Sequence, residues 1–273
     1  LVMTATPIPR TLALYVYSDL DISVIDKLPP GRKPVKTEFY NGDHRMLAYD
    51  LALDEIRKGR QVYIVCPLIE EDEKLSLNSV EKLYDELRDG IFRGINIEIL
   101  HGKMKPKEKD EIINRFKRDE TKVIISTTVI EVGVNVPNAS VMIIENAERF
   151  GLAQLHQLRG RVGRGQYESY CVLTGNAKTD NTKRRMEIMT ESTDGFYISE
   201  QDLKLRGSGE LFGLKQSGDE GFVLANLYDD VKILRCAREE GKMLLESEDP
   251  NKVKLCRDIA YSLERWSKYI CFN

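Results

Sequence analysis

Two arginines, Arg161 and Arg164, stand three residues apart in a glycine-rich stretch and are the side chains best suited to chemistry. A guanidinium group is planar, permanently charged and forked, which matches the oxygens of a phosphate. A helix-compatible run precedes them, and residues i and i+3 share one face of a helix, so the spacing directs both groups to one place. Gly160 and Gly163 lack side chains, which lets another surface approach closely. The alternative is ordinary pairing with surface carboxylates.

Hydroxyl side chains follow an apolar strand at residues 126–128, among them Thr127 and Thr128. Ligands of open parallel sheets bind at the carboxyl ends of the strands, so these hydroxyls are placed where a phosphate backbone could lie. Capping of the following helix is the alternative, and both roles can hold. Gly102 and Lys103 follow another strand end, where a bare backbone amide and a positive charge also suit a phosphate. The alternative for Lys103 and the lysines that follow it is that they form a solvated surface and do not contact a phosphate.

Strand-like and helix-like segments alternate from about residue 44, with a charged loop at 70–74. Such alternation predicts a mostly parallel sheet, and the continuous apolar strands predict burial on both faces. Strand signals end near residue 175, and a break at Asp249-Pro250 divides the last two helices. The expected strands are 61–66, 95–100, 123–126, 141–145 and 170–173, and the expected helices are 45–58, 79–88, 106–117, 180–192, 199–206, 226–246 and 252–270.

Composition excludes several other classes of protein. The net charge is −3, so any nucleic-acid contact must come from local patches and not from a global basic field. Five cysteines without C-x-x-C spacing indicate reduced thiols, and three scattered histidines do not predict a metal site. No apolar run approaches the ~20 residues of a membrane span, so we expect a cytoplasmic protein without a membrane partner.

The stretch Gln157–Arg164 resembles motif VI of superfamily-two helicases, which ends Gly-Arg-x-Gly-Arg. Residues 126–137 resemble motif V, and the Thr-Ala-Thr of residues 4–6 resembles motif III. Within that superfamily, the Pro-Ile-Pro-Arg of residues 7–10 and the linker Leu-Pro-Pro-Gly-Arg-Lys-Pro of residues 28–34 resemble the RecG family of fork-remodelling, ATP-dependent DNA helicases. The closely related Mfd family of transcription-repair coupling translocases is an alternative, as is a non-catalytic nucleic-acid-binding module.

The resemblance implies a RecA-like three-layer sandwich with a mostly parallel sheet, followed by a helical translocation module. Residues 1–37 would end the first motor domain and form a linker, residues 38–178 would be the second RecA-like domain, and residues 179–273 would hold the translocation motif and C-terminal helices. ATP would bind between two motor domains of a monomer. The other partner would be branched duplex DNA, in recombination and repair.

The resemblance also implies a role for individual residues. The arginines Arg161 and Arg164 would be catalytic and reach the γ-phosphate. Asn135 stands where most relatives have Asp, and it keeps a hydrogen-bond acceptor without the charge. The remaining implied roles are ATP binding by Gly133, Asn135 and Gln157, DNA binding by Gly102, Lys103, Thr127 and Thr128, and translocation coupling by Arg185, Arg206 and Gln216.

Two elements that ATP hydrolysis needs are absent from the sequence. It has no G-x-x-x-x-G-K-[S/T] phosphate loop and no Asp-Glu pair of the helicase type. The phosphate-cradling lysine and the Mg²⁺ ligands would then belong to the preceding motor domain, which follows an N-terminal wedge domain in the family. We therefore expect this chain to be inactive on its own.

Overall fold

The computed structural model describes residues 23, 25, 33–67, 73–127, 136–206 and 231–267 of the 273-residue chain. These residues fall into two compact units: the described residues from 25 to 205 belong to the first, and Ser23 and the described residues from 206 onward belong to the second. Motif III, most of the linker, residues 128–135 and residues 207–230 lie outside the described residues. The two units are described separately.

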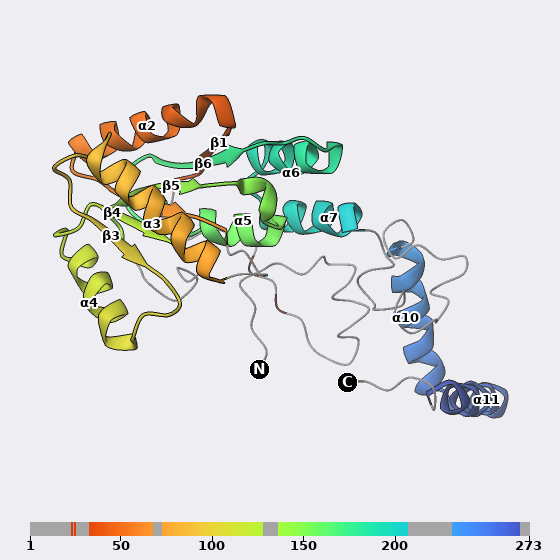
Figure 1. The fold of residues 1–273 in the computed structure, drawn as a ribbon. Coiled ribbons are helices and arrows are strands. Elements are labelled where there is room, and N and C mark those ends of the chain that lie inside the picture. The colour runs from red at the N-terminus through yellow and green to blue at the C-terminus, as the bar shows by residue number, and fades with distance from the viewer. Residues whose placement is uncertain are drawn as a thin grey trace. The chain divides into compact units, whose positions relative to one another are not determined.

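A six-stranded parallel sheet forms the centre of the first unit (Figure 1). Its strand order is β1-β6-β5-β2-β4-β3, and every neighbouring pair is parallel. Non-consecutive neighbours require crossover connections, which the helices supply. The strands are β1 Val35–Asn41, β2 Gln61–Val65, β3 Ile97–Leu100, β4 Val123–Ser126, β5 Ala139–Ile144 and β6 Ser169–Gly175.

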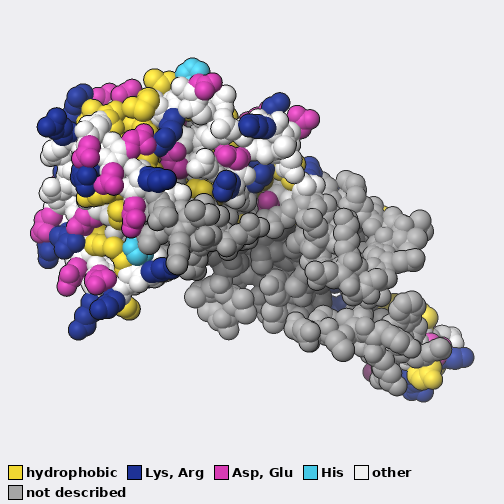
Figure 2. Space-filling model, viewed as in Figure 1, with side chains coloured by type: hydrophobic (Ala, Val, Ile, Leu, Met, Phe, Trp, Pro, Cys, Tyr) yellow, Lys and Arg dark blue, Asp and Glu magenta, His cyan; other side chains and the backbone are white. Residues whose placement is uncertain are grey.

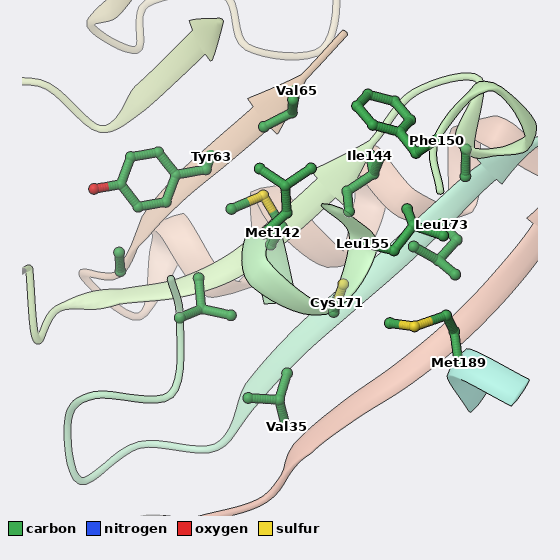
Figure 3. Close-up of a cluster of buried hydrophobic side chains, with 14 of the residues drawn as sticks. Val35, Tyr63, Val65, Met142, Ile144, Phe150, Leu155, Cys171, Leu173 and Met189 are labelled. Carbon is green, nitrogen blue, oxygen red and sulfur yellow. The ribbon is translucent and has the colours of Figure 1, made fainter. Parts of the chain in front are cut away.

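Both faces of the sheet are buried, as the continuous apolar strands predict. Side chains alternate between the faces along each strand: Val62 and Ile64 of β2 belong to one apolar cluster, and Tyr63 and Val65 to the other. The cluster that contains Tyr63 also includes Met142 of β5 and is drawn in Figure 3. The first unit is thus a three-layer α/β sandwich.

Helices cover the two faces of the sheet. Helices α2 (Arg45–Arg57) and α3 (Glu73–Asp89) pack on the face of Val62 and Ile64. Helices α4 (Pro106–Lys117), α5 (Leu152–Arg159) and α6 (Asp180–Glu191) pack on the other face. Short 3₁₀ turns, η1 (Gly42–His44) and η3 (Ala147–Arg149), precede α2 and α5, and α7 (Gly195–Arg206) follows α6.

Local sequence accounts for several of the helix starts. Proline occupies the first position of α4, where its missing N–H costs nothing, and the Glu108 side chain accepts a hydrogen bond from the Lys105 backbone at 3.1 Å. The Thr179 hydroxyl accepts from the amide of Thr182 and caps α6. Asp194 does the same for α7 through the amide of Phe196 at 2.9 Å.

Strand β1 is an element that the sequence analysis missed. It includes residues 35–37, which we assigned to the linker, and it pairs along its length with β6. Its residues are Val-Lys-Thr-Glu-Phe-Tyr-Asn, which mix charged and apolar types because β1 is an edge strand and only partly buried. The prediction of a charged loop at 70–74 was wrong at its C-terminal end, because Glu73 and Lys74 are the first residues of α3.

Among the residues that the structure describes, the second unit contains two helices, α10 (Val231–Leu245) and α11 (Pro250–Ser267). The predicted break between them is confirmed: α11 begins at Pro250, and the Asp249 carboxylate accepts a hydrogen bond from the amide of Asn251 at 2.9 Å. None of the helices in the described ranges has the length and apolar character needed to cross a bilayer.

Candidate functional site

Residues 160–165, here called the arginine loop, carry both predicted catalytic arginines. Helix α5 ends at Arg159, and the chain then turns through hydrogen bonds from the Arg161 amide to the Leu158 carbonyl and from the Val162 amide to the Arg159 carbonyl. Val162 is fully buried and anchors the loop in the core. Arg161 and Arg164 therefore do not lie on one helix face, and that part of the spacing argument is wrong.

Glycines determine the path of the arginine loop. Gly163 has a φ of +73°, a left-handed conformation, and a Cβ at this position would lie 2.7 Å from Cγ2 of Val35. A Cβ on Gly165 would lie 2.2 Å from the carbonyl oxygen of Pro137. The glycine-rich sequence thus lets the loop pack closely against the chain's own sheet, whereas we had expected the approach of another surface at Gly160 and Gly163.

The charges of both loop arginines act on one buried side chain, Tyr63 of β2. Burial raises the pKa of Tyr63, and the positive charges of Arg164 and Arg161 oppose that rise. The Tyr63 ring packs on Phe116 of α4, with 4.9 Å between ring centroids. Arg164 is exposed, and its Nε donates to the Gly160 carbonyl at 3.2 Å. The positive charges of both loop arginines therefore act on one phenol, which lies on the α4–α5 face of the sheet.

Arg159, the first arginine of the motif, is a functional candidate that the sequence analysis did not single out. It is only 3% exposed, and its Nη1 donates to the carbonyls of Met189 at 2.9 Å and Ser192 at 2.8 Å. Burial lowers its pKa, and nearby Cys171 opposes that shift. The sequence gives no sign that Arg159 is buried while its neighbour Arg161 is not. The difference between them is apparent only in the fold.

The predicted coupling residue Arg185 joins α6 to the segment that leads into α5. Its Nη1 donates to the Phe150 carbonyl at 2.5 Å and its Nη2 to the Glu148 carbonyl at 3.0 Å. Its Nε is buried without a hydrogen-bond partner. Arg206 is the last residue of α7, and Gln216 lies outside the described residues. The structure therefore gives contacts for one of the three predicted coupling residues.

Three of the four predicted DNA-binding residues follow the carboxyl ends of two adjacent strands, whereas Thr128 lies outside the described residues. Leu100 of β3 pairs with Ser126 of β4, so Gly102, Lys103 and Thr127 follow adjacent strand ends. The Gly102 carbonyl accepts from Lys109 Nζ at 2.6 Å, and Thr127 is buried. The arginine loop instead lies beside the first residues of β1 and β6, because Gly163 faces Val35 and Ser169. The two sets of residues lie at opposite ends of the strands.

The remaining predicted residues divide between described and undescribed parts of the chain. Gln157 is half-buried on α5, whereas Thr128, Gly133 and Asn135 lie outside the described residues. Within the described ranges, no group of three His, Cys, Asp or Glu residues could hold a metal ion. On the face of the first unit shown in Figure 2, Lys and Arg side chains are interspersed with Asp and Glu. Any nucleic-acid contact on this face is therefore local.

Comparison with known families defines the class of protein. Residues 43–166 match the helicase conserved C-terminal domain. Residues 192–262 match domain 3, C-terminal, of the ATP-dependent DNA helicase RecG. The parallel sheet, the covering helices and the position of the arginine loop after α5 are thus those of a RecA-like helicase C-terminal domain with a helical extension.

Individual relatives within that class are RecG helicases. The chain is 52% identical over 249 residues to the ATP-dependent DNA helicase RecG of Synechocystis sp. and 50% identical over 251 residues to that of Bacillus subtilis. Each match covers 91% of this chain, but only 30% and 36% of the relative. A solved structure of RecG bound to a three-way DNA junction is 46% identical, with a TM-score of 0.66, over 84% of this chain and 30% of that one.

The chain is therefore similar to the C-terminal motor portion of RecG helicases. It spans about a third of the length of the curated relatives it matches.

Proposed function

We propose that the chain is the second motor domain and translocation module of an ATP-dependent DNA helicase that remodels stalled forks and Holliday junctions. The observation that carries this proposal is the arginine loop, which holds Arg161 and Arg164 on a segment anchored by buried Val162 and shaped by its glycines. That loop lies within a chain whose sequence is 52% and 50% identical to those of two RecG helicases. The match of residues 192–262 to the RecG-specific domain favours RecG over the Mfd alternative.

In this proposal, ATP binds between the first motor domain and this one. Arg161 and Arg164 reach the γ-phosphate and stabilise the charge that develops as it is transferred. Gln157, Gly133 and Asn135 are the further proposed contacts to the nucleotide. The described residues do not offer a Mg²⁺ site, so we assign its ligands to the first motor domain and derive no step from the metal here.

The proposed DNA contacts are Gly102, Lys103, Thr127 and Thr128. The exposed Lys103 stands just before α4, whose N-terminal amides favour a phosphate. Thr127 is buried, so contact with DNA there requires its side chain to become exposed. A solved RecG binds a three-way junction, which supports branched DNA as the substrate of this chain's enzyme as well.

The wider organisation is also a proposal. We propose a monomer in the cytoplasm, in which an N-terminal wedge domain and a first motor domain complete the enzyme. Residues before β1 would form the linker between the motor domains, and the residues from 179 onward would form the translocation module. Closure of the two motor domains on ATP, and their opening after hydrolysis, would move the module along duplex DNA.

A chimaera tests the proposed function. The chain replaces the corresponding portion of the Bacillus subtilis RecG, to which it is 50% identical, and ATP hydrolysis and fork unwinding are measured. We expect the chimaera to hydrolyse ATP with DNA and to unwind forks, and the isolated chain to do neither because it lacks a phosphate loop. The unaltered relative is the control. A folded but inactive chimaera, or ATP hydrolysis by the isolated chain, would contradict the proposal.

Coupling of hydrolysis to movement gives a second prediction, for Arg206→Ala and Gln216→Ala in the intact enzyme. A coupling element changes its polar partners as the domains close, so its loss should spare the nucleotide site. Fork binding and most ATP hydrolysis should remain, because Arg161 and Arg164 are unchanged, while fork unwinding should fall at least tenfold. All three activities are measured on each variant. Unwinding that falls only in proportion to hydrolysis would refute the coupling role.

A further inference from the structure

Two arginines link helices α5 and α6: one lies on α5 and contacts α6, and the other lies on α6 and contacts the segment before α5. Arg159, at the end of α5, donates to the carbonyls of Met189 and Ser192 at the end of α6. Arg185, on α6, donates to carbonyls in the segment that leads into α5. The C-terminal end of α6 and the segment that leads into α5 are therefore each held by an arginine of the other helix, through charge-assisted hydrogen bonds, which are stronger than neutral ones.

Arg159 makes an unusual set of contacts for a buried charge. No carboxylate pairs with it among the described residues, although it is almost fully buried. Its charge is balanced by carbonyls at the C-terminal end of α6, where orphan acceptors and the helix dipole favour a cation. Its other contacts are Thr37 Oγ1 of β1 at 3.3 Å and Nδ1 of His156 at 3.0 Å. One guanidinium thus contacts α5, α6 and β1.

The position of Arg159 places it between two parts with separate proposed roles. Arg161 of the arginine loop lies two residues further along the chain. On the other side, Arg159 binds the carbonyls of Met189 in the last turn of α6 and of Ser192, which begins the connection to α7. Apolar contacts reinforce the link, since Leu158, Met189 and Ile198 of α7 share one buried cluster. Densely packed groups of this kind move together and transmit displacement.

We propose that Arg159 is a positioning residue that makes the arginine loop and the α6–α7 hairpin move as one body. The inference rests on the proposed motor function and adds a residue to it. When the loop is drawn toward the nucleotide, the contacts of Arg159 carry the end of α6 with it, and the hairpin follows. Arg159 itself touches neither nucleotide nor DNA in this account, and it acts through Arg161 and the hairpin.

The test uses Arg159→Lys in the intact enzyme. Lysine keeps the positive charge but has a single ammonium group, which cannot serve both carbonyls, Thr37 and His156 in the planar geometry of a guanidinium. We expect at least a fivefold loss in base pairs separated per ATP hydrolysed. Fork binding and the KM for ATP should change less than twofold. The control is Arg88→Lys, which alters an exposed arginine paired with Asp85 and Asp89 on α3 and should leave the ratio unchanged.

A purely structural role predicts a different result. If Arg159 only stabilises the fold, hydrolysis and unwinding will fall together and their ratio will stay constant, which would overturn the inference. Should Arg159→Lys fail to fold, His156→Ala decides the question, because it removes one contact of Arg159 without leaving a buried carbonyl unpaired. A reduced ratio in that variant supports the inference, and an unchanged ratio refutes it. Failure of the proposed function itself would show separately, as an unaltered enzyme that does not unwind forks.

Discussion

Replacement of Arg164 by alanine in the intact enzyme is expected to reduce ATP turnover by about 10³–10⁵, the range typical of an arginine that stabilises charge in phosphoryl transfer. Arg164 lies exposed on the arginine loop, where its Nε is held by the Gly160 carbonyl and its charge acts on Tyr63 beside that of Arg161. Binding of ATP should survive better than hydrolysis, because the transition state carries more charge at the γ-phosphate than the ground state does.

The measurement is steady-state ATP hydrolysis with fork DNA, together with equilibrium binding of a labelled nucleotide. Arg118→Ala is the matched control, because Arg118 is an exposed arginine that pairs with Glu120 in the turn after α4. Near-normal turnover in Arg164→Ala would make this arginine an ordinary surface residue. Arg161→Ala should lower turnover similarly and weaken nucleotide binding more.

Loss of the Phe116 ring should produce the largest change in stability, about 3–5 kcal/mol for Phe116→Ala. The side chain is fully buried in α4, its ring packs on Tyr63, and its carbonyl accepts a hydrogen bond from Gln61 Nε2 at 2.6 Å. A cavity here would remove the ring that packs against Tyr63, the side chain on which the charges of the arginine loop act. A cost of this size is a large share of the ~5–15 kcal/mol that stabilises a typical domain.

Urea unfolding of the isolated chain, followed by circular dichroism, measures this loss of stability. Leu47→Ala on α2 serves as the control, because Leu47 is half-exposed and its truncation should change the free energy of unfolding by about 0.5 kcal/mol or less. A loss below ~1 kcal/mol in Phe116→Ala would mean that the core around Tyr63 collapses around the missing ring and is less tightly packed than the structure shows.

The sheet was largely predictable because its strands are buried on both faces. Runs such as Val123–Ser126 are apolar at successive positions, and that pattern needs no tertiary information to be read. Strand β1 was not predictable in the same way, since an edge strand buries fewer of its side chains and keeps Lys36 and Glu38 exposed. Its membership of the sheet depends on pairing with β6, which is far away in the sequence.

The candidate site was predictable in its residue types but not in its geometry. The spacing of Arg161 and Arg164 indicated a pair, yet Gly160 ends α5 before either is reached, and the left-handed Gly163 then redirects the chain. Tyr63 gave no signal in the sequence because an aromatic residue in a strand is usually core. The burial of Arg159 could not be predicted either, because arginine is rarely buried. Its burial is explained only by its contacts with the end of α6 and with Thr37 of β1.

The position of β1 at the edge of the sheet affects how the sheet would respond to a mechanical force on the preceding residues. A pull on the residues before Val35 would load the edge strand along its length, so that its hydrogen bonds to β6 resist together in shear and do not unzip one at a time. The point where that load enters is also where Gly163 packs, since a Cβ on Gly163 would lie 2.7 Å from Cγ2 of Val35 and 3.7 Å from the Lys33 carbonyl oxygen. Tension arriving through the preceding segment would therefore enter β1 at the place where the arginine loop packs against it.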